Sequence, residues 1–236
     1  FSLSAQSYIT NVTIADVEKQ KLITNQTIVI TNDKITDIKK STKIKIPANA
    51  TAIDGSGKFL FPGLTDAHIH FFQNGGLYTR PDAIDFRKER PYHKEIDYSH
   101  QNMENVLHRY LQNGITNVID VGASYNLLKQ RDGYKNKVNL PSVYMTGPLL
   151  TTYEPAAYKD LGNDTPFSLV KTIEDGINMV KEQLPHQPDF IKIWYIVGAD
   201  GLSNEASARK SLPIIKAIID EAHKNNLKVA VHASQR

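Results

Sequence analysis

The first quarter of the chain consists of short segments that are rich in β-branched residues or alternate between apolar and polar residues. These segments are residues 8–14, 27–30, 34–38, 52–53 and 59–61. Successive side chains of a strand point to opposite faces, so this pattern is typical of half-buried strands. Turn-forming residues separate the segments at Asn32-Asp33 and at 54–57. We therefore predict a small antiparallel β-sandwich module over residues 7–61.

After Pro62 the pattern changes to apolar runs that alternate with amphipathic segments. The apolar runs predict strands at residues 64–70, 115–121, 142–145, 190–197 and 228–232. Between them, apolar residues recur at spacings of three and four, which predicts helices around residues 103–111, 125–130, 170–184 and 214–222. Strands that alternate with helices imply a parallel sheet with the helices outside it.

The connections in this second region differ in length. Links from helix to strand are short, as at Asn113-Gly114, whereas links from strand to helix are long, above all after residues 64–70 and 142–145. In (β/α)₈ barrels the active site lies at the carboxyl ends of the strands and is built from those longer loops. We therefore predict that residues 62–236 form the first part, strands one to five, of an α/β barrel of the TIM type. An open doubly wound sheet is the alternative, although it gives no reason for the candidate ligands described below to converge.

Composition and charge exclude several classes of function. The 236 residues contain no cysteine, which excludes disulfides, thiolate metal ligands and a cysteine nucleophile. The net charge of +3 is mild, and no basic patch is interleaved with aromatic residues, so we expect no nucleic-acid partner. No apolar run approaches the length of a membrane span, so we expect no membrane partner.

The chain begins with Phe1-Ser-Leu-Ser-Ala-Gln6 rather than with Met, and this stretch resembles the end of a secretory signal with Ala5 at the cleavage point. Leu3 occupies the −3 position of such a signal, which usually carries a smaller residue. We expect residues 1–6 to be a signal-peptide remnant and the protein to be periplasmic or secreted. The alternative is a tag remnant or an arbitrary boundary on a cytoplasmic protein.

Candidate metal chemistry is concentrated in Phe-Pro-Gly-Leu-Thr-Asp-Ala-His-Ile-His, residues 61–70. His68 and His70 stand two residues apart in an extended segment, so their side chains point to the same face. Neutral imidazole is the commonest protein ligand for zinc and similar metals. Asp66 lies on the same face, where a carboxylate can orient a ligand. This segment therefore supplies half of a metal site.

Two later strands carry further candidates. Lys192 lies within an apolar strand, where burying a charged lysine is costly unless the charge is paired. His232 directly follows the apolar residues 229–231, at the end of the last predicted strand. Lys192 could reach water or a carboxylate, and His232 could be an ordinary core histidine. Alternatively, the lysine is carboxylated by carbon dioxide to a carbamate that bridges two divalent cations. We interpret the remaining histidines as structural or surface residues; these are His93, His100, His108, His186 and His223.

Together these stretches resemble the amidohydrolase superfamily of metal-dependent hydrolases, in particular its imidazolonepropionase- and prolidase-like branch. The resemblance is carried by residues 52–58, 61–70, 114–122, 190–194 and 221–232. It implies that His68 and His70 bind the first of two divalent ions, expected to be zinc. It further implies that Lys192, as the carbon dioxide-derived carbamate, bridges to a second ion held partly by His232.

The resemblance also implies a small-molecule substrate and a reaction, the hydrolysis of amide or other C–N bonds in peptides or cyclic amides by a metal-bound hydroxide. Asp66 and Asp120 are expected to orient the metal ligands without binding the metal themselves. Tyr153 and Tyr195 are expected to contact the substrate. Lys192 favours two metals, because the family members with a single metal lack a lysine ligand on strand four.

The family pattern requires two more ligands, a histidine on strand six and an aspartate on strand eight that is also the general base. Both strands would follow Arg236, so we expect an N-terminal fragment that is inactive alone. We expect it to form a homo-oligomer or to be completed by a C-terminal fragment. Two alternatives remain open: a mononuclear heterocycle deaminase in which Lys192 is structural, and a degenerate barrel used for binding without catalysis.

Overall fold

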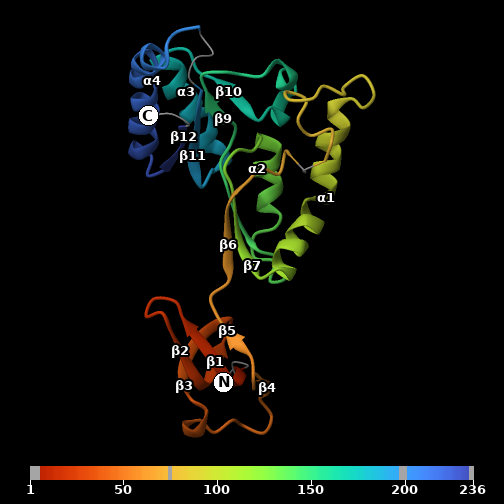
Figure 1. Ribbon diagram of the computed structural model, residues 1–236, viewed down its shortest axis with the longest axis vertical. Coiled ribbons are helices and arrows are strands. Elements are labelled where there is room, and N and C mark those ends of the chain that lie inside the picture. Colours follow the sequence, from red (N-terminus) through yellow and green to blue (C-terminus); the bar gives the residue numbers. More distant parts are fainter. Residues whose placement is uncertain (1–5, 74–75, 197–200, 234–236) are drawn as a thin grey trace. The chain divides into compact units, whose positions relative to one another are not determined.

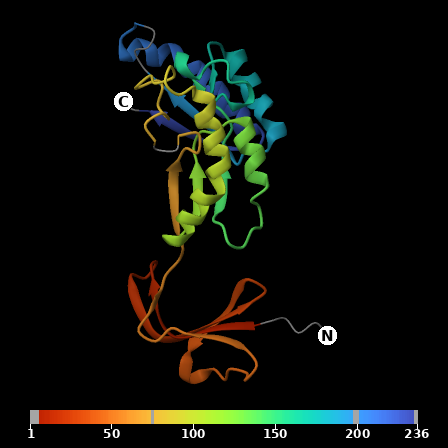
Figure 2. The same ribbon diagram turned by 90° about the vertical axis from the view of Figure 1, so that its right-hand side faces the viewer.

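The computed structural model describes residues 6–73, 76–196 and 201–233. The chain divides into two compact units, Phe1–Pro62 and Gly63–Arg236, shown as ribbons in Figures 1 and 2. The division falls within the Pro-Gly pair, one residue after the expected boundary. Of the expected signal remnant, residues 1–5 lie outside the described residues, and Gln6 begins the first strand.

The N-terminal unit is built on one five-stranded sheet. Its strands are β1 (Gln6–Asp16), β2 (Lys21–Thr31), β3 (Lys34–Lys40), β4 (Thr51–Asp54) and β5 (Phe59–Leu60). The order is β3-β2-β1-β4, and β5 also pairs with β1. Asn32 and Asp33 both adopt positive φ angles, 48° and 61°, as a two-residue hairpin turn between β2 and β3 requires.

The expected antiparallel sandwich is wrong in two respects, because this sheet is mixed and has no second layer among the described residues. The β1-β2 and β2-β3 pairs are antiparallel, but β4 and β5 both run parallel to β1. The long connection after β3 allows the chain to return to the start of β1 before β4 begins, so β4 then runs in the same direction as β1. The described residues of this unit form a single sheet and no second layer.

The second unit contains two parallel sheets. The first consists of β6 (Leu64–Ile69), β7 (Ile115–Asp120) and β8 (Ser142–Met145), in that order. The second consists of β9 (Leu149–Thr151), β10 (Phe167–Leu169), β11 (Phe190–Tyr195) and β12 (Lys228–Ala233), in the order β10-β9-β11-β12. All five predicted strands are present, whereas the short strands β9 and β10 were not predicted. The described strands form open parallel sheets and do not close into a barrel.

Among the described residues of this unit, four α-helices cover one face of these sheets. They are α1 (Tyr92–Gln112), α2 (Tyr125–Asp132), α3 (Ile173–Gln183) and α4 (Asn204–Lys224). Figures 1 and 2 show α1 and α2 alongside β6, β7 and β8, whereas α3 and α4 lie beside β11 and β12. The core accordingly has two clusters, one around Met103, Leu107 and Val118 and one around Ile191 and Ile218. No helix within the described part of the chain is both long and apolar enough to cross a membrane.

A buried arginine fastens α2 to the start of β11. Arg131 is 1% exposed and contacts the carboxylates of Asp132 and Asp189, the latter at 2.7 Å. Asp189 Oδ2 also accepts a hydrogen bond from the backbone N–H of Met145 at 2.7 Å, and Asp189 N–H donates to the Met145 carbonyl at 2.9 Å. This cluster therefore links the end of β8, in the first sheet, to the beginning of β11, in the second.

We expect Arg131→Ala to lower the free energy of unfolding by about 3 kcal/mol, because hydrogen bonds to charged groups contribute about 1.5–3 kcal/mol each when one partner is buried. Lys135 contacts the same Asp132 carboxylate from the surface, so Lys135→Ala is a matched control with an expected loss below about 1 kcal/mol. Urea unfolding of both variants measures the difference. Equal losses would show that burial of Arg131 contributes nothing to stability.

Candidate functional site

The end of β6 brings two imidazoles together. Ile69 packs into the core beneath the sheet, so His68 and His70 on either side of it face the other way. Their ring centroids lie 5.4 Å apart with an interplanar angle of 84°. The Nδ1 atom of His70 lies 3.1 Å from the carbonyl oxygen of Gly122. When Nδ1 donates to this carbonyl, Nε2 keeps its lone pair, which is the form that binds a metal.

A fully buried carboxylate lies behind His70. Asp120 ends β7 with its side chain 0% exposed, and its Oδ1 atom is 3.7 Å from His70 Nδ1. The two carboxylate oxygens accept backbone hydrogen bonds from Phe71 and Gly122, both at 3.0 Å. Burial raises the pKa of Asp120, whereas the His70 contact and the two N–H donors act in the opposite direction. Asp120 therefore fixes the backbone on both sides of the site and orients the His70 ring.

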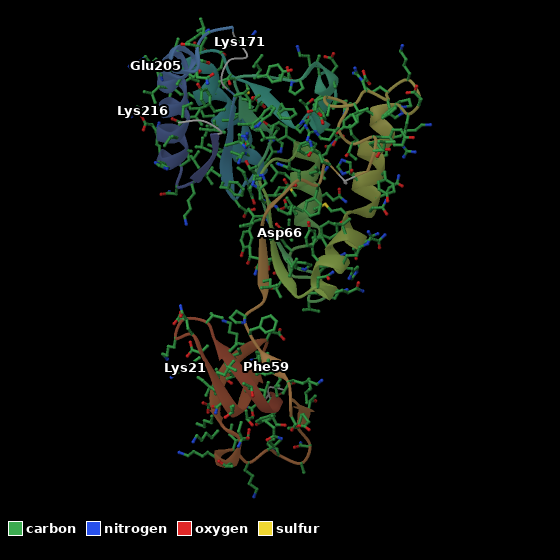
Figure 3. All side chains as sticks on the ribbon, in the orientation of Figure 1. Lys21, Phe59, Asp66, Lys171, Glu205 and Lys216 are labelled. Atoms are coloured by element: carbon green, nitrogen blue, oxygen red, sulfur yellow. The ribbon has the colours of Figure 1, made fainter. Side chains whose placement is uncertain are left out.

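Asp66 does not lie on the face of His68 and His70, where the sequence predicted it. It pairs with Val118, and the β6-β7 register shifts between Asp66 and Ile69, so Asp66 shares the face of Ile69 and Asp120. It lies on β6, where it is labelled in Figure 3, and its Oδ1 atom accepts a hydrogen bond from the backbone N–H of His68 at 3.3 Å. Its negative charge raises the pKa of the His68 imidazole, against the lowering effect of desolvation. Asp66 thus supports the first histidine through the backbone and through its charge.

Lys192 lies in the middle of β11 and is only 5% exposed. Its neighbours Ile191 and Ile193 pack against the helices, so the lysine belongs to the opposite face of the sheet. Within the described part of the chain, no hydrogen bond or ion pair engages its amine. Burial lowers the pKa of Lys192, because the charged form loses its hydration. A pairing with a carboxylate, one of the two ordinary explanations for a lysine here, is therefore absent among the described residues.

The candidate ligands from three strands face one region. Desolvation lowers the pKa of the His68 imidazole, and nearby positive charges act in the same direction. Those charges belong to His70, Lys192 and His232. In the β11-β12 register Lys192 pairs with Ala230 and Trp194 pairs with His232, which places Lys192 and His232 on the same face two residues apart. Within residues 6–73, 76–196 and 201–233, no group of three or more His, Asp or Glu side chains is arranged to hold a metal.

The two tyrosines expected to contact substrate lie on different sides of the sheet. Tyr195 packs in the core against the helices, and its hydroxyl is buried without a hydrogen-bond partner among the described residues. The structure therefore does not bring Tyr195 to the face of Lys192. Tyr153 is 45% exposed, and its ring lies 6.4 Å from that of Trp194. Sequence reasoning missed Trp194, although its position two residues after Lys192 places it on the same face.

An apolar hollow lies on the face of the sheets that carries Lys192, near the amino ends of β11 and β12. It has a volume of about 510 Å³. Its lining includes Ala67, Ile119, Tyr144, Phe190, Lys228 and Ala230. All five predicted strands thus contribute side chains to one concave face.

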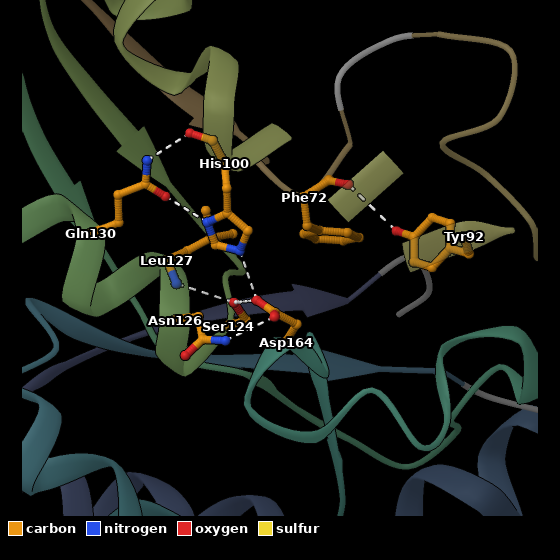
Figure 4. A network of polar contacts seen from close by, with 8 residues as sticks. All are labelled: Phe72, Tyr92, His100, Ser124, Asn126, Leu127, Gln130 and Asp164. Atoms are coloured by element: carbon orange, nitrogen blue, oxygen red, sulfur yellow. Dashed lines mark hydrogen bonds and ion pairs between the residues drawn. The ribbon is translucent and has the colours of Figure 1, made fainter. Parts of the chain in front are cut away.

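A polar network fastens the segment after β9 to the first two helices (Figure 4). His100 on α1 contacts Asp164 Oδ1 through Nε2 at 2.8 Å and Gln130 Oε1 through Nδ1. Asn126 donates to the other Asp164 oxygen at 2.8 Å, and Ser124, which caps α2, donates to Oδ1 at 3.3 Å. Both acceptors facing the His100 ring are oxygens, so the ring makes both contacts only as the imidazolium. The hydrogen bond to Asp164 is the main cause that raises the pKa of His100.

This geometry predicts a pH-dependent contribution to stability. A raised pKa in the folded state gives a stabilisation that is complete below the unfolded pKa of about 6.5 and is lost as pH rises through the folded pKa. We therefore expect His100→Gln to lose about 1.5–3 kcal/mol near pH 5.5 and progressively less at higher pH. Urea unfolding between pH 5.5 and pH 9 measures this, with His108→Gln on the exposed side of the same helix as control. A loss that does not change with pH would contradict charging of His100.

Comparisons with known proteins agree with this fold. The model of the amidohydrolase family matches residues 59–236. An enamidase from Eubacterium barkeri is 27% identical over 217 residues, which cover 91% of this chain and 46% of the enamidase. A prolidase structure in complex with N-methylphosphonate-L-proline superposes with a TM-score of 0.73 at 23% identity, over 97% of this chain and 56% of that one. A Xaa-Pro dipeptidase with bound methionine gives a TM-score of 0.69 at 21% identity, over 97% and 57%.

The chain thus spans about half the length of the relatives that it matches. The family match begins at β5 and includes every strand and helix of the second unit. It also includes His68, His70, Lys192 and His232. The chain belongs to the amidohydrolase family.

Proposed function

We propose that this chain supplies the first half of a (β/α)₈ barrel in a metal-dependent hydrolase that cleaves amide or other C–N bonds. The observation that carries the proposal is Lys192, a residue only 5% exposed whose amine has no partner among the described residues, on the face that it shares with His232 and near His68 and His70. Family membership supports hydrolysis, and the similarity to an enamidase, a prolidase and a Xaa-Pro dipeptidase supports a C–N bond as the bond that is cleaved. Peptides and cyclic amides are the substrate classes that we infer.

The donor set fits two divalent cations. His68 and His70 provide neutral nitrogen donors for the first, and the His70 ring is held by the Gly122 carbonyl. Imidazole ligation without thiolates suits zinc. When bound, such ions would activate water and polarise the scissile carbonyl. Asp120 would keep the His70 ring in place throughout the reaction.

Lys192 has the properties of an amine that becomes carboxylated. Its neutral form is favoured by burial, and only the neutral amine has a lone pair to attack carbon dioxide. A bond then forms between Nζ and the carbon of carbon dioxide, and one proton leaves the nitrogen. The product is an anion with two oxygen donors, which removes the need for a carboxylate partner. We propose that it bridges the two cations.

The remaining ligands, a histidine and an aspartate that acts as general base, are proposed to come from outside these 236 residues. The chain alone would then be inactive. Metal analysis of the whole protein, together with hydrolysis of Xaa-Pro dipeptides and cyclic amides, tests the function. We expect about two ions per chain and metal-dependent release of the amine. One ion would favour a mononuclear deaminase, and none would favour a binding barrel.

A further inference from the structure

An aromatic pair stands beside the candidate ligands at the carboxyl end of β11. Trp194 lies two residues after Lys192, about 7 Å farther along the strand on the same face. Across the sheet it pairs with His232. One side of its indole rests on Phe167, with ring centroids 5.0 Å apart. The Trp194 ring also neighbours the ring of Tyr153, with ring centroids 6.4 Å apart.

Tyr153 is held in this position by its backbone. The Thr151 hydroxyl donates to the Tyr153 carbonyl at 2.7 Å and accepts from the Tyr153 N–H at 3.0 Å. The next hydroxyl, of Thr152, donates to the Ile196 carbonyl at 3.1 Å and accepts from the Ile196 N–H at 3.2 Å. Two of these hydrogen bonds therefore close a turn between Thr151 and Tyr153, and the other two fix Thr152 to Ile196, just after β11. The Tyr153 ring itself is 45% exposed.

We propose that Tyr153 and Trp194 form a binding subsite for an aromatic group of the substrate, next to the bond that is cleaved. The proposal rests on the proposed function, because it takes Lys192 and His232 as the position of the reacting centre. A ring in this subsite would be one side-chain length from that centre, since Trp194 lies about two strand residues beyond Lys192. Aromatic groups gain from edge-to-face or offset contacts in addition to the burial of apolar area. The rigid backbone of Tyr153 means that little conformational entropy is lost on binding.

A binding experiment tests the subsite without requiring turnover. Trp194 is the single tryptophan of these 236 residues, and the difference in fluorescence between the unmodified protein and Trp194→Phe reports on ligands at this position. We would titrate the whole protein with 3-phenylpropionate and with propionate, and subtract the signal of Trp194→Phe. Both probes carry the same carboxylate, so the ratio of their dissociation constants isolates the phenyl ring. We expect 3-phenylpropionate to bind about tenfold more tightly, equivalent to about 1.4 kcal/mol.

Tyr153→Ala should bring this ratio close to one and leave the affinity for propionate unchanged. Tyr144→Ala is the matched control, because Tyr144 is also 45% exposed but lines the hollow near the amino ends of β11 and β12. Its ratio should stay near that of the unmodified protein. Equal affinities for the two probes, or a preference that survives in Tyr153→Ala or disappears in Tyr144→Ala, would overturn the proposal.

The same variants separate the subsite from the reaction. For substrates with an aromatic group beside the scissile bond, Tyr153→Ala should raise KM about tenfold with kcat nearly unchanged, as loss of uniform binding does. If no C–N bond is hydrolysed but the fluorescence ratio behaves as expected, the subsite stands and the proposed function fails. If hydrolysis is found and the ratio is one, the subsite fails and the function stands.

Discussion

Replacing Lys192 with Arg is expected to remove at least one metal ion per chain from the whole protein and to lower hydrolysis about a hundredfold or more. The guanidinium group stays protonated, cannot be carboxylated, and would face two cations with its own positive charge. Lys192→Ala should lose metal in the same way, but short carboxylates added during reconstitution should restore part of it by acting as the bridging anion. Metal content and turnover are measured with carbon dioxide supplied and withheld.

The ordinary explanation of Lys192 predicts the opposite result. A lysine that only reaches water from an apolar strand would be replaced by Arg with metal content and rate nearly unchanged. Lys228→Arg is a suitable control, because Lys228 lines the same concave face at the start of β12, away from the histidines. An active Lys192→Arg protein with full metal content would eliminate the bridging role and leave a site for one ion at most.

Replacing His68 or His70 with Ala is expected to abolish metal binding at the first position and to reduce turnover about a hundredfold or more, while the fold persists. Neither ring belongs to the hydrophobic core, and the residue between them, Ile69, supplies the packing of this strand end. The loss of stability should therefore stay within about 1 kcal/mol for His68→Ala. For His70→Ala it should reach about 1–3 kcal/mol, because the buried Asp120 carboxylate loses one of its partners. Metal analysis and urea unfolding measure the two effects separately.

His223→Ala provides the control for these variants. His223 is an exposed histidine near the end of α4, where a cation favours the helix dipole, and its loss should leave the metal content unchanged. If His68→Ala and His70→Ala both keep full metal content and turnover, this pair does not ligate a metal. A loss of stability larger than expected in either variant would instead assign the histidine a structural role.

The local pattern of the sequence was sufficient to predict most strands and helices of the second unit. Apolar runs and three- or four-residue spacings predicted all five main strands and the positions of α1 to α4, because helices and strands repeat their buried faces at different periods. The pattern did not predict β9 and β10, which have three residues each. These strands are defined by their pairing, β9 with β11 and β10 with β9. So short a strand has no period of its own to detect.

The direction of pairing also depended on tertiary structure. The residues of β4 and β5 indicate strands, but nothing in them specifies that they run parallel to β1. That direction follows from where the preceding connection brings the chain back to the sheet. The same limit applies to barrel closure, which depends on strands that pair across the whole fold rather than on neighbours in the sequence.

By itself, the sequence determined the pairing of His68 and His70 on one face and the shared face of Lys192 and Trp194, because alternation along a strand is a local property. Only the tertiary structure decided that β6, β11 and β12 present these side chains to one region, and that the Lys192 amine has no carboxylate partner among the described residues. It also decided that Asp120 supports His70 whereas Tyr195 packs against the helices. Burial and contact depend on elements far apart in the chain, and no local pattern specifies which of them meet.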